Sequence, residues 1–162
     1  MNATSTPAGS ITLQREGRRS ERATLWRGAA LTAVAAILFP RLNAVLHEGQ
    51  AIYQLDTEAA IGIPAILAAT AILFATLGRW AWRADGGVNR PAKVGAVCGV
   101  LGVVSVIVFF VSAPIVLGGF AVTLGLEGAR RAAVAGRRRH AVAAVALGSL
   151  ALLVGAVIWL LA

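Results

Sequence analysis

Cysteine is almost absent from this sequence, which has only Cys98 in 162 residues. One cysteine excludes a disulfide framework and a thiolate-ligated metal site within a single chain. Charge is absent altogether from four long runs, residues 28–40, 59–78, 94–126 and 141–162. Small proton-driven exporters need a carboxylate at membrane depth, so these uncharged runs argue strongly against that class.

The uncharged runs are filled with apolar residues. Hydrophobic residues make up 58% of the chain, and the mean hydropathy is +0.78. This exceeds what a soluble domain of this length can hide in its core. The runs are also long enough, or nearly so, to cross a hydrocarbon layer of about 30 Å. We therefore predict an all-α, polytopic membrane protein with four to five membrane segments.

The third run, 94–126, has 33 residues and as one helix would reach roughly 50 Å, well beyond the thickness of the hydrocarbon layer. Pro114 lies near its middle; it cannot donate a backbone hydrogen bond and biases Ala113 away from helical angles. This favours a turn and a helical hairpin. A single helix kinked at Pro114 is the alternative, since proline is tolerated inside membrane spans.

The basic residues between the runs favour the hairpin. Five Lys and Arg precede the first run, one follows it, and the next two gaps hold four and five. A single crossing by 94–126 would divide them nine against six, whereas a hairpin divides them fourteen against one. Because basic flanks resist translocation, we expect the hairpin, a cytoplasmic N-terminus and a multi-pass membrane protein.

The same patterns give the expected domain organisation. Residues 1–22 are polar and are predicted to form a disordered cytoplasmic tail. Residues 23–83 are predicted to hold two transmembrane helices, 25–40 and 59–80, joined by an external loop at 41–58. Residues 91–162 are predicted to form a Gly/Ala-rich helical membrane unit with segments at 94–111, 114–128 and 141–161.

Small residues recur at helical spacing in each segment of the third unit. In lipid there is little hydrophobic drive between helices, so close contact of small residues must supply much of their association. We predict three helix-packing stripes, formed by Gly95, Gly99 and Gly102, by Gly118, Ala121 and Gly125, and by Gly148, Ala151 and Gly155. Packing within the chain is the first interpretation, and docking of another protein is the alternative.

The C-terminal part, roughly residues 91–161, also resembles a widespread bacterial membrane domain of unknown function. That domain pairs a Pro and Leu-Gly segment, ending in a short Arg-rich loop, with an Ala-rich segment that carries another Leu-Gly. The matching positions are Pro114, Leu117, Gly118, Ala121, Leu124, Gly125, Arg130, Arg131, Gly136, Ala141, Ala144, Leu147 and Gly148. Glu127 and His140 depart from the pattern. The resemblance implies a closely packed helical unit and no catalytic residues.

Reactive groups are few. His47 and His140 are expected at opposite membrane faces, too far apart to share a metal or haem, so no catalytic residue, metal site or cofactor is predicted. The hydroxyls within the runs are expected to bond to carbonyls one turn back. Arg137, Arg138 and Arg139 could contact anionic lipid headgroups or simply determine topology, and the same residues can do both.

These observations favour a non-enzymatic accessory or interaction protein that packs through small-residue helix faces. A small transporter or channel subunit acting as an oligomer is the alternative. The expected partners are the lipid bilayer, its anionic headgroups, and a membrane protein or a second copy of the chain. Nucleic acid is not expected as a partner, because the basic residues lie between apolar runs and do not form a basic domain.

Overall fold

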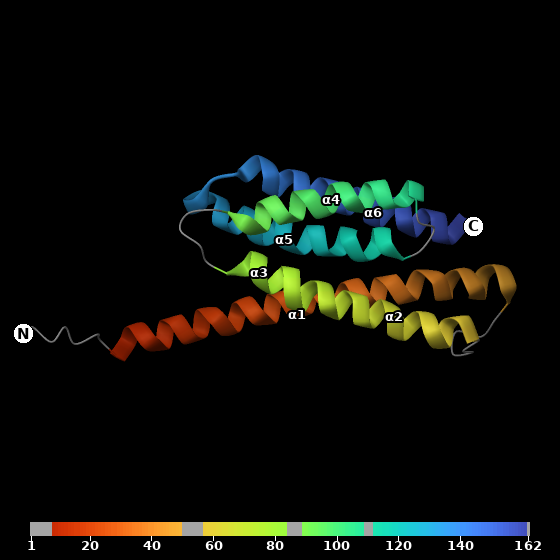
Figure 1. Cartoon of the computed structure of the whole chain (residues 1–162), viewed down its shortest axis with the longest axis horizontal. Helices are drawn as coiled ribbons and strands as arrows, with labels where there is room; N and C mark the ends of the chain where they lie inside the picture. The colour runs from red at the N-terminus through yellow and green to blue at the C-terminus, as the bar shows by residue number, and fades with distance from the viewer. Residues whose placement is uncertain (1–7, 50–56, 84–88, 109–111, 162) are drawn as a thin grey trace, which may run out of the picture.

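The computed structural model describes residues 8–49, 57–83, 89–108 and 112–161, and this part of the chain is almost entirely helical, without strands. The helices are α1 (Ala8–Glu48), α2 (Thr57–Leu73), the π-helical segment η1 (Phe74–Gly78), α3 (Arg79–Trp82), α4 (Arg90–Val108), α5 (Ala113–Ala135) and α6 (Arg138–Leu161). Since α2, η1 and α3 follow one another without a break, the described residues form five helical rods, arranged as in Figure 1. The predicted all-α class is confirmed.

The rods form two groups that lie against each other (Figure 1). One group is the antiparallel pair of α1 and the α2–η1–α3 rod, and the other is the bundle of α4, α5 and α6. The rings of Phe74 and Phe120 meet edge to face across the two groups, with centroids 4.8 Å apart. Leu25 and Leu124 are buried in the same cluster. Aromatic and aliphatic contacts therefore join the N-terminal pair to the bundle.

The third apolar run forms a hairpin and not a kinked helix. Helix α4 ends at Val108, α5 begins at Ala113, and the two lie antiparallel (Figure 1). Glycine positions give the register: Gly102 faces Gly118, while Gly95, nearly two turns earlier, faces Leu124. Ser112 precedes α5 and Pro114 stands in its first turn, where its missing N–H leaves no hydrogen bond unmade.

Four helical segments are long and apolar enough to cross a membrane: Arg22–His47, Ala60–Trp82, Arg90–Ile107 and Arg138–Leu161. Helix α5 is not among them, because Glu127, Arg130 and Arg131 lower its hydropathy. It contacts α1, α4, α6 and η1, and most of its first half is buried. A less apolar helix can occupy this central place because protein, and not lipid, surrounds most of it.

The N-terminal boundaries differ from those predicted. Helix α1 begins at Ala8 and continues through Pro40 to Glu48, so residues 8–22 are helical where a disordered tail was expected. Leu, Gln, Arg and Glu, which favour helices, are frequent in this segment, and polarity alone does not prevent a helix. The first part of the predicted loop 41–58 is likewise helical. Residues 1–7 and 50–56 lie outside the described residues.

The C-terminal helices are longer than predicted. Helix α5 extends to Ala135, seven residues past the expected end at 128, and α6 begins at Arg138 instead of 141. Gly136 and Arg137 alone form the turn, both with positive φ (67° and 59°). Helix α4 begins at Arg90, four residues before the predicted start. Several charged residues expected in loops, among them Arg130, Arg131 and Arg138, thus belong to helix ends.

The two ends of the molecule differ in charge. The end of α3, the start of α4, the end of α5 and the start of α6 meet at one end, toward which the N-terminal half of α1 also extends (Figure 1). We call this the basic end, because its described residues include Arg27, Lys93, Arg130, Arg131 and Arg137–Arg139. At the opposite end, the described residues include one Lys or Arg, Arg41.

Candidate functional site

The small residues predicted for helix packing meet in the α4–α5–α6 bundle. A Cβ on Gly148 would lie 2.7 Å from the carbonyl oxygen of Gly118, and one on Gly118 would lie 2.7 Å from that of Gly148. Two backbones can approach this closely only without side chains between them. Helix α5 and α6 are therefore in direct backbone contact near their middles.

Helix α4 joins this contact from its own glycines. Cβ atoms built on Gly95 and Gly102 would lie 3.0 Å and 3.1 Å from the Cβ atoms of Ala144 and Ala151. Gly99 faces Leu147 between them. The contacts advance in the same direction along both helices, so α4 and α6 are parallel. The remaining predicted positions are at the same three-helix contact: Ala121 is fully buried, Gly125 faces Val145, and Gly155 faces Ile115.

Three further glycines, which belong to none of the predicted stripes, also make close contacts. Cβ atoms on Gly28 and Gly119 would collide with Thr123 and Thr32, and one on Gly128 would lie 2.8 Å from the backbone of Ala92. The contacts of Gly28 with Thr123 and of Gly119 with Thr32 bring α1 and α5 close together where the two helices cross. Gly128 follows Gly125 by three residues and so continues the stripe of Gly118, Ala121 and Gly125. This helical spacing could have predicted that Gly128 also packs against a neighbouring helix.

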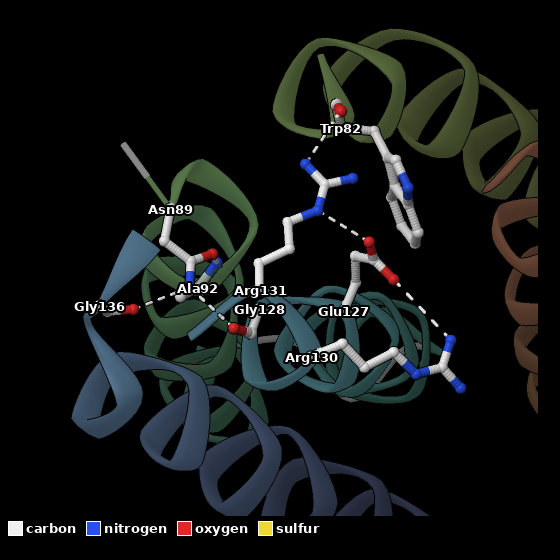
Figure 2. A network of polar contacts seen from close by, with 8 residues as sticks. All are labelled: Trp82, Asn89, Ala92, Glu127, Gly128, Arg130, Arg131 and Gly136. Carbon is white, nitrogen blue, oxygen red and sulfur yellow. Dashed lines mark hydrogen bonds and ion pairs between the residues drawn. The ribbon is translucent and has the colours of Figure 1, made fainter. Parts of the chain in front are cut away.

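A polar cluster at the basic end ties α3 to α5 (Figure 2). Arg131 Nε donates to Glu127 Oε1 at 2.7 Å, and Arg131 Nη1 donates to the carbonyl oxygen of Trp82 at 3.1 Å. The guanidinium also lies 5.8 Å from the centroid of the Trp82 ring. Arg130 Nη1 lies 3.8 Å from Glu127 Oε2, so two arginines neutralise one largely buried carboxylate.

Asn89 joins three backbone segments in the same region (Figure 2). Its amide nitrogen donates to the carbonyl oxygens of Gly128 and Gly136, at 2.7 and 3.0 Å, and its Oδ1 accepts from the Ala92 N–H at 3.4 Å. The side chain is buried. Asn89 therefore caps the start of α4 and fastens it to the end of α5. An Asn just before a first helical turn that contains Pro is a helix-start signal, so the sequence Asn89-Arg90-Pro91 could have predicted this cap.

The membrane-depth hydroxyls mostly bond to their own helices, as predicted. Thr32, Thr76, Ser105 and Thr123 donate to carbonyl oxygens three or four residues earlier, at 2.6–2.8 Å. Ser112 instead donates to the carbonyl oxygen of Ala36 at 3.3 Å, linking the hairpin turn to α1. Thr70 Oγ1 is buried with no hydrogen-bond partner among the described residues.

A groove of about 320 Å³ lies between α1 and α5, with Leu152 of α6 at its side. Its floor is the tight crossing of Gly28 with Thr123 and of Gly119 with Thr32. Its other lining residues are Thr24, Arg27, Leu31, Ala35, Val122, Leu126, Glu127 and Arg130. The charged residues of this lining come from the basic end, and the rest is mostly apolar.

The other predicted positions lie at the ends of the bundle. Arg137, Arg138 and Arg139 are all exposed at the basic end. His140 follows them, whereas His47 lies 3.1 Å from the Leu160 carbonyl oxygen at the far end of α6, so the histidines are at opposite ends as expected. Within residues 8–49, 57–83, 89–108 and 112–161, no three His, Cys, Asp or Glu side chains gather where they could hold a metal ion.

Comparison with family models, with curated proteins and with solved structures finds no match for this chain.

Proposed function

We propose that this chain is a non-enzymatic accessory protein of the bacterial inner membrane that binds a partner through an exposed face of α2. The four apolar helices support residence in a membrane. The basic end supports a cytoplasmic N-terminus, since basic flanks stay on the cytoplasmic side. The bacterial inner membrane is proposed from the sequence pattern of residues 91–161 alone, since no family model matches the chain.

The carrying observation is an unused small-residue surface on α2. Ala65, Ala68, Ala69, Ile72 and Thr76 are all exposed and follow one another at helical spacing, and we call them the α2 alanine face. The glycine stripes of α4, α5 and α6 are, by contrast, occupied by contacts within the chain. Small residues permit the close approach that helices need in lipid, so this face fits a transmembrane helix of another protein or a second copy.

The packing of α2 against the rest of the molecule uses its inward side and not the alanine face. Ile66 and Leu73 pack against a cluster that includes Ala36 and Ile115, and Phe74 is fully buried. The side chains that attach α2 to the molecule are thus large, whereas its exposed side carries small residues together with Ile61, Leu67 and Ile72. Substitution on the alanine face should therefore alter association without unfolding the chain.

Site-specific photocrosslinking tests the proposal. A photoreactive residue replacing Ala68 is expected to give one discrete adduct in membranes, and Ala65→Leu with Ala69→Leu should abolish it by blocking close approach. Ala146→Leu, at an exposed alanine of α6, is the matched control and should leave the adduct unchanged. A chain that forms no adduct from α2 and purifies from mild detergent as a strict monomer would contradict the proposal.

The alternative, a transporter or channel subunit, has less support. A shared path would need polar groups that face a cavity, but Thr32 and Thr123 beside the groove already donate to backbone carbonyls. The α4–α6 contact is filled by glycine and alanine. Flux across vesicles containing the reconstituted protein would favour this alternative over the accessory role.

A further inference from the structure

The groove between α1 and α5 has two chemically different parts. Toward the basic end it is lined by Arg27, Glu127 and Arg130. Away from that end, Leu31, Ala35, Val122 and Leu126 provide apolar walls. Its volume of about 320 Å³ falls within the ~300–1,000 Å³ typical of small-molecule sites. The lining therefore matches an amphiphile, with one polar and one apolar end.

The charged part carries a net positive charge. Glu127 is the one carboxylate in the lining, and it already accepts from Arg131 at 2.7 Å and lies 3.8 Å from Arg130. Arg130 remains 69% exposed. Arg27 forms no hydrogen bond or ion pair with another described residue. Two arginines from different helices thus face the groove with one neutralised carboxylate between them, which favours an anionic group.

The remaining lining offers little to a polar ligand. The hydroxyls of Thr32 and Thr123 donate to the carbonyl oxygens of Gly28 and Gly119, at 2.8 Å each, so their hydrogens are already used. From Arg27 to Ala35 the groove extends about 12 Å along α1, at about 1.5 Å per residue. It leads from the basic end toward the middle of the bilayer. A lipid acyl chain runs in this same direction.

We propose that this groove binds an anionic phospholipid, with one acyl chain along Leu31, Ala35, Val122 and Leu126 and the phosphate between Arg27 and Arg130. The site lies apart from the α2 alanine face, so it does not depend on the proposed partner. It also differs from the exposed Arg137–Arg139 segment, because it adds an apolar channel to the charge. A phospholipid can fill this apolar channel with an acyl chain, whereas a free anion cannot.

Native mass spectrometry of the full chain in a neutral detergent, with equal amounts of dioleoyl phosphatidylglycerol and dioleoyl phosphatidylcholine, tests the proposal. We expect one phosphatidylglycerol to be retained per chain in preference to phosphatidylcholine. A basic residue near a headgroup contributes about fivefold to affinity. Because Glu127 offsets part of the charge of Arg130, Arg27→Ala with Arg130→Ala should lower phosphatidylglycerol retention about tenfold, and Arg27→Lys with Arg130→Lys should largely preserve it.

Two controls separate this site from general electrostatic attraction. Arg137→Ala with Arg138→Ala removes the same charge from the same end but leaves the groove intact, and should lower phosphatidylglycerol retention much less than the Arg27 and Arg130 pair does. Ala35→Leu narrows the apolar channel while leaving both arginines in place, and should lower retention of either lipid. Inorganic phosphate in excess should not displace the bound lipid, because it cannot occupy the channel.

Three results would overturn the proposal. Equal losses in the two double alanine variants would mean diffuse attraction to the basic end. Equal retention of the two lipids by the wild-type chain would mean that the arginines select no headgroup. Displacement by inorganic phosphate would make the site a simple anion site. Thermal melting of each variant shows whether it is folded. If Ala35→Leu is unfolded, the arginine variants still test the proposal.

Discussion

Glu127 illustrates how one side chain can make a polar helix end compatible with a membrane bundle. Its side chain is only 12% exposed, yet both oxygens face arginines of its own helix. Arg131 in turn reaches the Trp82 carbonyl, so the carboxylate positions the group that links α5 to α3. A buried charge is tolerated because it is paired and hydrogen-bonded.

Replacing Glu127 by glutamine should therefore loosen the α3–α5 link. The charge-assisted bond from Arg131 would become a weaker neutral one, and we expect a loss of about 1–2 kcal/mol in the free energy of unfolding. Arg130→Ala is the comparison, since the 69% exposed Arg130 should contribute at most about 1 kcal/mol. Thermal unfolding in detergent measures both. Equal effects of the two variants would show that Glu127 does not hold the cluster together.

Glycine at position 148 should be far less replaceable than glycine at position 62. Gly148→Ala would place a methyl group 2.7 Å from the Gly118 carbonyl oxygen, forcing α5 and α6 apart at a cost of about 1–3 kcal/mol. Gly62 lies in α2 with nothing within 4 Å of a built Cβ, so Gly62→Ala should keep or raise stability, by up to about 1 kcal/mol. Comparable melting temperatures for the two variants would contradict the backbone contact.

Single residues were predictable where their spacing carried the signal. The glycine stripes were visible because glycine recurs on one face of each helix, whereas Gly28 and Gly119 belong to no such repeat, and their contacts with Thr123 and Thr32 arise only through the fold. Asn89 and Trp82 were missed for a related reason. Their partners, Gly128 and Arg131, lie about forty or more residues away, and no local pattern connects them.

The helices show where local sequence signals were sufficient and where they were not. Pro114 and the charge distribution pointed to the hairpin, but the expected end of its second arm, 128, stopped short. The predicted segment included Glu127 but stopped before Arg130 and Arg131, although the four-residue spacing of Glu127 and Arg131 is a pairing signal that favours a continuing helix. The helix instead ends at Ala135, just before Gly136, whose positive φ of 67° suits glycine. Pro40 likewise did not end α1.

The start of α4 depends on a side chain that precedes it. Asn89→Ala would remove the cap on Ala92 and two bonds to the end of α5, and we expect unfolding to become easier by about 2 kcal/mol. Asn89→Asp keeps an oxygen that can accept from Ala92, but it places a carboxylate oxygen where the amide donated to the Gly128 and Gly136 carbonyl oxygens at 2.7 and 3.0 Å, so it should cost at least as much. Hydrogen exchange should accelerate at residues 90–93 and 128–136 in the alanine variant. Unchanged exchange at 128–136 would show that Asn89 acts only as a cap.

The molecule as a whole combines a rigid bundle with a more open helical pair. Glycine and alanine contacts bring α4, α5 and α6 together, and α1 is fastened to the far end of α6 by Asn43, whose amide donates to the Trp159 carbonyl oxygen at 2.6 Å. The α2–η1–α3 rod carries the alanine face on its exposed side, beside exposed large residues such as Leu67 and Trp80. The proposed partner surface and lipid groove therefore both lie on or beside the N-terminal pair, outside the α4–α6 contact.

The most direct test of this account is the side of the membrane on which α5 ends. In a Cys98→Ala background, Ala133→Cys marks the end of α5 and Leu161→Cys the end of α6, both exposed positions. With a membrane-impermeant maleimide on intact bacterial spheroplasts, five passes from a cytoplasmic N-terminus predict that Leu161→Cys labels at once and Ala133→Cys labels only after permeabilisation. Labelling of Ala133→Cys in intact spheroplasts, or protection of Leu161→Cys, would contradict it.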